Sequence, residues 1–133
     1  MCGTPRRNIV SIQILGTDGN PITSRDVDGS ASNFIYANGK LVFSGSYTNG
    51  TGDTLNWSTI ADKIGSDQCI SCAISTQTIG NNYVAQGGVA TAITSWIVRC
   101  QTPGALSELA TGSYPSGITG DTVTFSAVFR KLL

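Results

Sequence analysis

The sequence predicts an all-β fold: a single-domain β-sandwich, jelly-roll-like, with at most one or two short helices. The chain has 133 residues, the length of one domain with a substantial core. Charged residues make up 12% of it, about half the usual share, and Ser, Thr, Gly and Asn, which suit strands and turns, replace them. About six to eight short apolar segments follow one another at near-regular spacing, with turn residues between them. We assign residues 1–8 to an N-terminal arm and residues 9–133 to the sandwich.

The first predicted strand is "IVSIQIL", residues 9–15, in which alternate apolar residues share one face: Val10, Ile12 and Ile14. The arm before this strand carries Arg6 and Arg7, the only pair of adjacent cations before the C-terminus. This pair is either solvated or holds the acidic surface of a partner. Residues 22–32 are polar and predict at most a short edge strand and a loop.

The segment "FIYANGKLVF", residues 34–43, predicts a β-hairpin. Asn38-Gly39 is the preferred pair for a two-residue type I′ turn, which fixes the register of the strands on either side. Ala37 would then face Lys40, and four residues would form an apolar patch on one face of the hairpin: Phe34, Tyr36, Leu41 and Phe43.

The middle of the chain predicts one short helix and two further strands. Ser58 is placed to cap the helix, and Gly65 to end it. Residues 69–79 and 89–101 predict strands separated by the connection "GNNYVAQGG". Both faces of the strand at 89–101 carry apolar residues, so we expect it to be central and covered on both sides.

The end of the chain carries the most regular pattern. Residues 122–130 alternate between polar and apolar residues, with one face made by Val123, Phe125, Ala127 and Phe129. We therefore expect the chain to end inside its sheet. This last strand could close the sheet of its own subunit or pair with the edge of another.

Four cysteines leave three possibilities open. They could bind zinc, form one disulfide, or remain buried free thiols: Cys2, Cys69, Cys72 and Cys100. "CISCAIS" is typical of a strand, in which residues three apart point to opposite faces, and this favours the free thiols.

The residue types needed for catalysis are scarce. There is no histidine to act as a base near neutral pH, and Glu108 is the only glutamate. Four aspartates adjoin a glycine, as turn residues do: Asp18, Asp28, Asp53 and Asp121. We therefore expect no enzyme activity, no cofactor and no metal.

Charge and hydropathy bound the partners. The net charge is zero, which argues against nucleic acid, because nucleic-acid binding requires a basic face. No apolar run approaches the roughly 20 residues needed to span a membrane, and the N-terminus lacks the pattern of a secretory signal. The sequence thus predicts synthesis in the cytoplasm of the host cell and partners that are proteins.

Two stretches, "YTNGTGDTLNWSTIA" (residues 47–61) and "ELATGSYPSGITGDTVTFSAVFRKLL" (residues 108–133), carry a resemblance to a known family. They resemble small structural proteins of tailed bacteriophages that are found beside the major capsid protein. The family pattern "Y-x-x-G-G-D-T-L" is matched by Tyr47, Gly52, Asp53, Thr54 and Leu55. The closing pattern is matched by Leu109, Ala110, Gly112, Tyr114, Pro115, Thr119, Gly120, Asp121, Val123, Phe129 and Lys131.

The resemblance implies a decoration or cement protein on the outside of the virion capsid. Such a protein would bind across neighbouring subunits of the major capsid protein and would itself form a homodimer or homotrimer. The candidate contact residues are Arg6 and Arg7 in the arm and Trp57 and Tyr114 near loops. For Trp57 and Tyr114, packing in the core is an equal alternative.

A second hypothesis is a receptor- or carbohydrate-binding module of a phage tail fibre or a cell-surface protein. Such a module shares the β-sandwich fold. Four aromatic residues could stack on sugars: Trp57, Tyr83, Trp96 and Tyr114.

Overall fold

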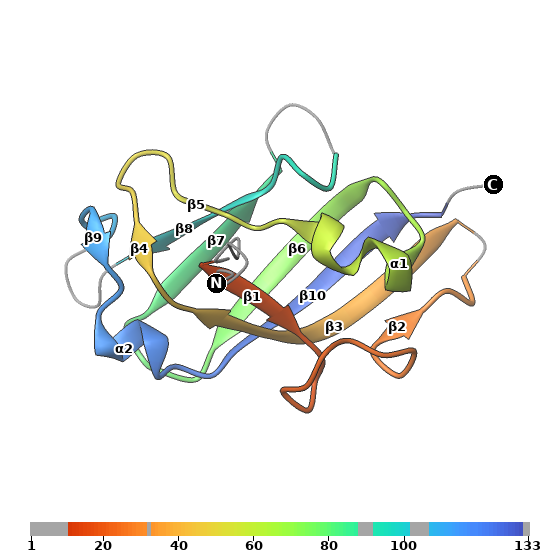
Figure 1. Cartoon of the computed structure of the whole chain (residues 1–133), viewed down its shortest axis with the longest axis horizontal. Helices are drawn as coiled ribbons and strands as arrows, with labels where there is room; N and C mark the ends of the chain where they lie inside the picture. Colours follow the sequence, from red (N-terminus) through yellow and green to blue (C-terminus); the bar gives the residue numbers. More distant parts are fainter. Residues whose placement is uncertain (1–10, 32, 88–91, 102–106, 132–133) are drawn as a thin grey trace, which may run out of the picture.

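A five-stranded antiparallel sheet, called here the main sheet, crosses the molecule (Figure 1). The computed structural model describes residues 11–31, 33–87, 92–101 and 107–131. The strand order is β1-β3-β10-β6, and β2 pairs with β3. The strands are β1 (Ile12–Leu15), β2 (Val27–Asp28), β3 (Phe34–Phe43), β6 (Cys69–Thr76) and β10 (Val123–Arg130).

Two smaller sheets complete the fold. A three-stranded sheet has the order β5-β8-β7, and β4 pairs with β9 in a two-stranded sheet. Their strands are β4 (Ser46–Tyr47), β5 (Asp53–Thr54), β7 (Asn82–Gln86), β8 (Ile97–Gln101) and β9 (Gly112–Ser113). Among the described residues the helices are the 3-10 turn η1 (Trp57–Ile60), α1 (Ala61–Ile64) and α2 (Ser116–Thr119). The predicted all-β domain is confirmed, whereas this strand order does not confirm a jelly roll.

The predicted C-terminal strand is confirmed as β10. Its alternate residues are buried, as the pattern required: Val123, Phe125, Ala127 and Phe129. Ala127 lies opposite Ala37 of β3 on one side and opposite Cys72 of β6 on the other. Both edges of β10 are thus paired within its own chain, so the last strand closes the sheet of its own subunit.

The predicted hairpin at Asn38-Gly39 is wrong, because β3 runs without interruption through both residues. Gly39 lies opposite Phe125 in the sheet, and a Cβ atom at position 39 would lie 2.8 Å from the Phe125 ring. The glycine makes room for a neighbouring strand and ring and is not there to supply a turn conformation. The buried face of β3 is also different from the predicted one, since it consists of Ile35, Ala37, Leu41 and Phe43.

The predicted helix is present and starts two residues earlier than expected. Asn56 is the N-cap, and its side-chain oxygen accepts a hydrogen bond from the Ser58 amide at 3.0 Å. Gly65 ends the helical segment with φ 71°, as predicted. Asn is as good a cap as Ser, so the helical segment can begin at the earlier residue.

The region after β6 departs from the prediction. The supposed connection at residues 80–88 contains β7, which pairs with β8 along its length. Within the described part of residues 89–101, the regular strand is β8 at Ile97–Gln101, and it is central in the three-stranded sheet, between β5 and β7. In the first predicted strand Ile12 and Ile14 are buried as expected, while Val10 lies outside the described residues.

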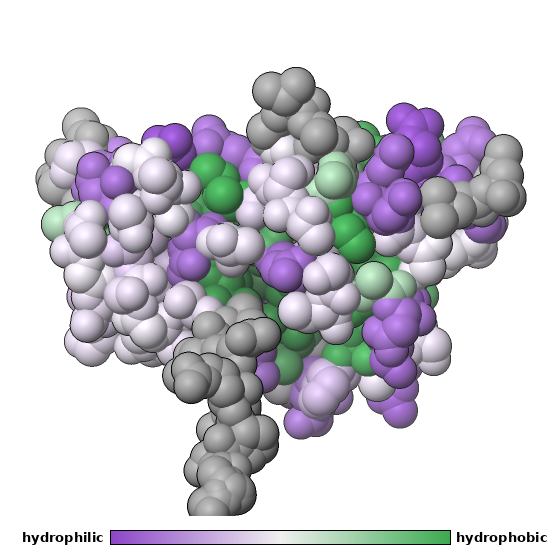
Figure 2. All heavy atoms as spheres, turned by 45° about the horizontal axis from the view of Figure 1, so that its top comes forward, coloured by the Kyte–Doolittle hydropathy of each residue, from purple (hydrophilic) through white to green (hydrophobic). Residues whose placement is uncertain are grey.

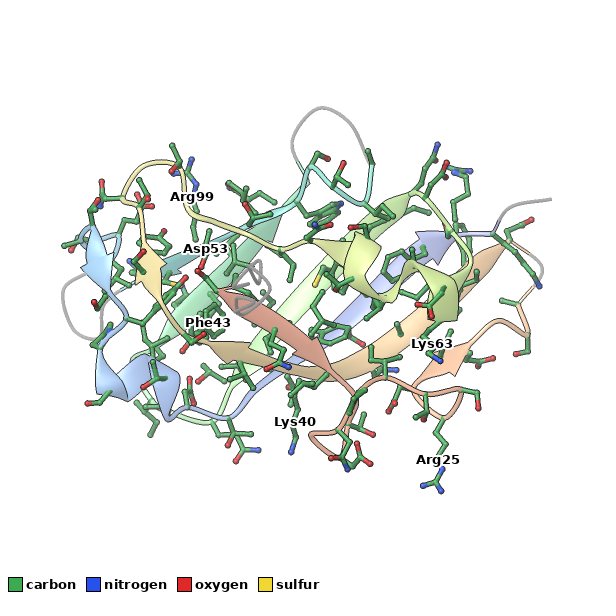
Figure 3. The ribbon with its side chains drawn as sticks, viewed as in Figure 1. Arg25, Lys40, Phe43, Asp53, Lys63 and Arg99 are labelled. Atoms are coloured by element: carbon green, nitrogen blue, oxygen red, sulfur yellow. The ribbon has the colours of Figure 1, made fainter. Side chains whose placement is uncertain are left out.

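One apolar core lies between the main sheet and the three-stranded sheet. Phe43 lies at one end of it, pointing inward, and its ring stacks on Tyr83 with 5.1 Å between centroids (Figure 3). Among the described residues, no helix is long and apolar enough to cross a membrane.

Candidate functional site

Two of the residues predicted to contact a partner are buried in the core. Trp57 is 0% exposed and Tyr114 is 7% exposed. Trp57 packs edge-on against Phe125 and Phe129, with 5.3 and 5.2 Å between ring centroids. The prediction that these two side chains form a contact surface is wrong, and the alternative of core packing holds. Arg6 and Arg7 lie outside the described residues.

The aromatic residues proposed to stack on sugars are buried as well. Tyr83 and Trp96 are each 5% exposed, and with Trp57 and Tyr114 they belong to the same core cluster. The hypothesis of a carbohydrate-binding face made by these four rings is therefore wrong.

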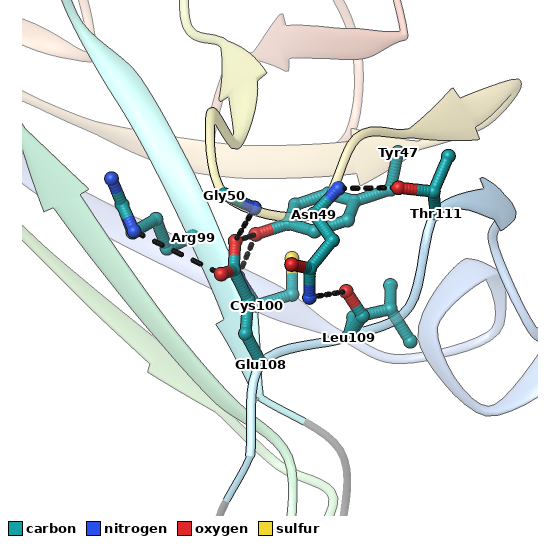
Figure 4. Close-up of polar contacts among 8 residues, drawn as sticks. All are labelled: Tyr47, Asn49, Gly50, Arg99, Cys100, Glu108, Leu109 and Thr111. Carbon is teal, nitrogen blue, oxygen red and sulfur yellow. Dashed lines mark hydrogen bonds and ion pairs between the residues drawn. The ribbon is translucent and has the colours of Figure 1, made fainter.

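The two stretches that carry the family resemblance lie side by side. Ser46 and Tyr47 of β4 pair with Ser113 and Gly112 of β9. Asn49 extends this pairing: its amide nitrogen donates to the Thr111 hydroxyl at 2.8 Å and its side chain donates to the Leu109 carbonyl at 3.0 Å (Figure 4). Segments about 60 positions apart in the sequence thus form one structural unit.

Glu108 is the polar centre of this unit (Figure 4). Its Oε2 atom accepts a hydrogen bond from the Tyr47 hydroxyl at 2.6 Å and another from the Gly50 amide at 3.0 Å. These two bonds, with a weaker contribution from the Arg99 guanidinium 3.8 Å away, hold the pKa of Glu108 below its ordinary value. The Tyr47 hydroxyl also accepts a hydrogen bond from the Cys100 amide at 3.1 Å.

A second tyrosine–carboxylate pair lies next to the first. The Tyr114 hydroxyl donates to Asp53 at 2.6 Å. The two residues come from the two stretches of the resemblance, and the Tyr114 ring meets Tyr47 at 5.8 Å between centroids. Burial raises the pKa of Asp53 above its ordinary value, although the bond from Tyr114 acts in the opposite direction.

A third pair joins Tyr83 to Asp121, with 2.8 Å between the hydroxyl and the carboxylate. Asp121 also accepts hydrogen bonds from Thr76, Thr78 and Asn81. Partial burial alone would raise the pKa of Asp121, but these donors together outweigh it and lower the pKa to about 2.

The three pairs connect distant segments of the chain. Each carboxylate is occupied by donors of its own chain, and burial is the main reason why the pKa of each tyrosine is raised. A tyrosine that acts as a base or nucleophile needs the opposite shift. Among the described residues, no group of three or more His, Cys, Asp or Glu side chains is arranged to hold a metal ion.

Sequence reasoning missed these pairs. Three of the four aspartates beside a glycine accept a hydrogen bond from a neighbouring backbone amide, as turn residues do: Asp18 from Asn20, Asp28 from Ser30 and Asp53 from Thr54. Asp121 instead accepts hydrogen bonds from side chains. The adjoining glycine identifies a loop position. It does not reveal that a tyrosine from a distant segment will meet the carboxylate.

Three described cysteines are free thiols, of which Cys69 and Cys100 are buried and Cys72 is half-buried. Burial raises the pKa of each thiol to about 12, so none is activated as a nucleophile. Cys69 and Cys72 were expected on opposite faces of the strand. A bulge in the β6–β10 pairing changes the alternation, and both cysteines contact the core.

The outer face of the main sheet, opposite the core, is a regular surface made by alternate residues of its strands. It carries hydroxyl and amide groups, aliphatic and aromatic side chains and two cations, and Asp28 of β2, which lies opposite Tyr36, adds one carboxylate. Lys40 points away from the core on this side (Figure 3), and a shallow depression of about 330 Å³ is lined in part by Asn38, Thr124 and Ser126. The outer face consists of Gln13, Leu15, Asp28, Phe34, Tyr36, Asn38, Lys40, Val42, Ser71, Ala73, Ser75, Thr124, Ser126, Val128 and Arg130.

Figure 2 shows the hydropathy of one side of the molecule. On the side shown in Figure 2 most atoms are pale, and the apolar ones lie largely in recesses between weakly polar side chains. The strongly hydrophilic residues on this side form separate groups.

The fold and this polar unit define the class of the protein as a small all-β domain in which three half-buried carboxylates accept hydrogen bonds from buried tyrosines. Comparison with protein-family models, with curated proteins and with solved structures finds no match for the chain.

Proposed function

We propose that this chain is a decoration protein of a bacteriophage capsid, bound to the outside of the shell across neighbouring copies of the major capsid protein. The observation that supports the proposal is that the two stretches that resemble such proteins contact each other in the structure. They interlock through the β4–β9 pairing and through the Tyr47–Glu108 and Tyr114–Asp53 bonds. The matching residues therefore serve one local structure, which is what a shared fold element requires.

The surface chemistry supports the same function. A decoration protein needs a rigid body with a face that packs against another polypeptide. The outer face of the main sheet offers hydroxyls and amides for hydrogen bonds, and Tyr36 and Val42 are about 40% exposed on it. An interface with few charges depends little on ionic strength, because there is little for salt to screen.

The mechanism is stabilisation by mass action. A protein that binds the assembled shell and not the free subunit shifts the equilibrium towards the shell by the free energy of binding. Repeated over a symmetric surface, modest interfaces act together, particularly if the chain is itself a homodimer or homotrimer.

Purified particles of the phage that carries this gene test the proposal. We expect the chain in a fixed ratio to the major capsid protein, and we expect particles that lack it to release their DNA at a lower temperature or under a milder osmotic shock. Re-adding purified protein should restore the stability, whereas an unrelated β-sandwich of similar size should not. Absence of the chain from the particle, or its presence on the tail alone, would contradict the proposal, and a cryo-EM map distinguishes these outcomes.

A further inference from the structure

The turn between β6 and β7 displays an isoleucine that the fold does not use. Ile79 is 100% exposed, whereas the other exposed large apolar side chains of the described residues are 40–46% exposed and lie on strands. The Asn81 amide donates to the Thr78 carbonyl at 3.2 Å, and Gly80 has φ 98°. Ile79 is therefore the second residue of a type II-like turn, a position that Pro favours. The turn conformation does not require an isoleucine there, and the fully exposed side chain does not pack in the core.

Side-chain hydrogen bonds to Asp121 hold the turn that carries Ile79. Asp121 accepts hydrogen bonds from the Thr78 hydroxyl at 2.7 Å and from the Asn81 side chain at 3.0 Å, on either side of the tip. The Thr76 hydroxyl also donates to Asp121, and the Thr78 amide donates to Thr76 at 3.0 Å. Such bracing fixes the position of the tip before any partner is bound, which lowers the entropy that binding has to overcome.

We infer that Ile79 is an anchor that inserts into an apolar pocket on a partner protein. This inference rests on the proposed function: the pocket would lie on the surface of the capsid. A single exposed apolar side chain is common on protein surfaces. Ile79 differs because its side chain is fully exposed and its turn is held by hydrogen bonds to Asp121, as expected for a preorganised contact. Interface energy concentrates in a few such anchors surrounded by polar contacts.

The chemistry around the tip favours a protein over a lipid surface. Residues 76–81 carry no charged side chain, and the nearest ionised group is the Asp121 carboxylate. Surface binding to a membrane requires a wider apolar face and, on anionic lipids, cations. One convex branched side chain with hydroxyl and amide neighbours matches a small concave site with polar groups at its rim.

The experiment measures binding of the purified full-length protein to capsids that lack it, by co-sedimentation over a concentration series. Ile79→Ser should raise the Kd about ten- to a hundredfold per site, the effect expected from losing a buried isoleucine. Val84→Ser is the matched control, because Val84 is 46% exposed on β7 and should leave the Kd unchanged. Neither variant should change the melting temperature, since neither side chain belongs to the core.

The role of the brace is tested in combination with the anchor. Asp121→Asn should weaken binding while Ile79 is present and add little in the Ile79→Ser background, because both changes act on the same contact. If the wild-type chain binds capsids and Ile79→Ser binds equally well, the inference fails and the proposed function stands. If the wild-type chain does not bind capsids at all, both fail. Binding to phosphatidylcholine or phosphatidylglycerol vesicles that is lost in Ile79→Ser would overturn the protein pocket in favour of a membrane.

Discussion

The main sheet and the loop-rich end of the molecule, where β4, β9 and α2 lie together, are held by different forces (Figure 1). In the main sheet β10 pairs along its whole length with β3 and β6, and every second residue is buried. At the loop-rich end the strands are two residues long, and side-chain hydrogen bonds connect segments about 60 positions apart.

This difference teaches how each region can be damaged. Burial of apolar surface stabilises the main sheet, so a cavity there should cost most. The loop-rich end depends on three polar pairs whose members satisfy one another, so removing one partner should cost less but should be sensitive to pH. Variants of each kind, with a control from the same neighbourhood, test this division.

The largest effect is expected for Phe129→Ala in β10. Phe129 is 0% exposed and packs against Trp57, and deleting a buried ring lowers the free energy of unfolding by about 3–5 kcal/mol. Val128→Ala is the control, since Val128 is the adjacent residue on the outer face and should cost less than about 1 kcal/mol. Chemical denaturation measures both. Equal losses for the two variants would show that the alternation in β10 does not separate core from surface.

The next effect tests why Gly39 is a glycine. A methyl group at position 39 would meet the Phe125 ring and the Leu15 carbonyl, so Gly39→Ala should destabilise the protein by about 2 kcal/mol through overpacking. Gly117→Ala places the same methyl group in open space in α2, and it should be neutral or stabilise by up to about 1 kcal/mol. If Gly39→Ala were harmless, the close approach of the strands at this position would be wrong.

The main sheet was largely predictable from the sequence. The period of two in residues 122–130 predicted the bounds and the buried face of β10, because a strand with one buried face needs an apolar residue at every second position. The prediction at Asn38-Gly39 failed because it used the turn preference of these two residues alone, without the neighbouring strand that packs against them. A glycine that makes room for the ring of Phe125 cannot be told from a turn glycine until the partner strand is known.

The polar unit at the loop-rich end was not predictable in the same way. Tyr114, expected as a contact residue, is a buried hydrogen-bond donor to Asp53. Its partner is 61 positions away, and nothing in the composition of either loop identifies the other. Exposure of an aromatic residue beside a loop cannot be inferred from the loop, because turn residues often flank core anchors.

The third prediction compares two carboxylates of the loop-rich end. Asp121→Asn should lower the free energy of unfolding by about 1–2 kcal/mol, because the uncharged amide accepts from fewer of the four donors and loses the stronger bonds to a charge. Asp53→Asn is the matched control, because its amide oxygen can still accept from Tyr114 and the cost of a partly buried charge is removed. It should be close to neutral at pH 7. A loss at Asp53→Asn as large as at Asp121→Asn would contradict the contrast.

The same pair predicts opposite dependences on pH. The folded pKa of Asp121 is about 2, below the unfolded value of about 3.9. Its contribution is therefore present above pH 4 and is lost as the pH falls towards 2, so the stability difference between wild type and Asp121→Asn should shrink over that window. The pKa of Asp53 is raised, so its ionisation costs stability as the pH rises through the folded pKa, and Asp53→Asn should remove that cost. Denaturation curves between pH 2 and 7 measure both differences.

The smallest effect is expected for Tyr114→Phe. The ring stays in its contacts with Phe43 and Tyr47, and only the bond to Asp53 is lost, at about 1 kcal/mol. Tyr36→Phe removes a hydroxyl from a side chain that is 41% exposed on the outer face and should change the stability by less than about 0.5 kcal/mol. Loss of the Tyr114 hydroxyl should also raise the pKa of Asp53 further, because that bond opposes the effect of burial. A variant that loses stability while the titration of Asp53 is unchanged would mean that the hydroxyl acts through packing and not through the carboxylate.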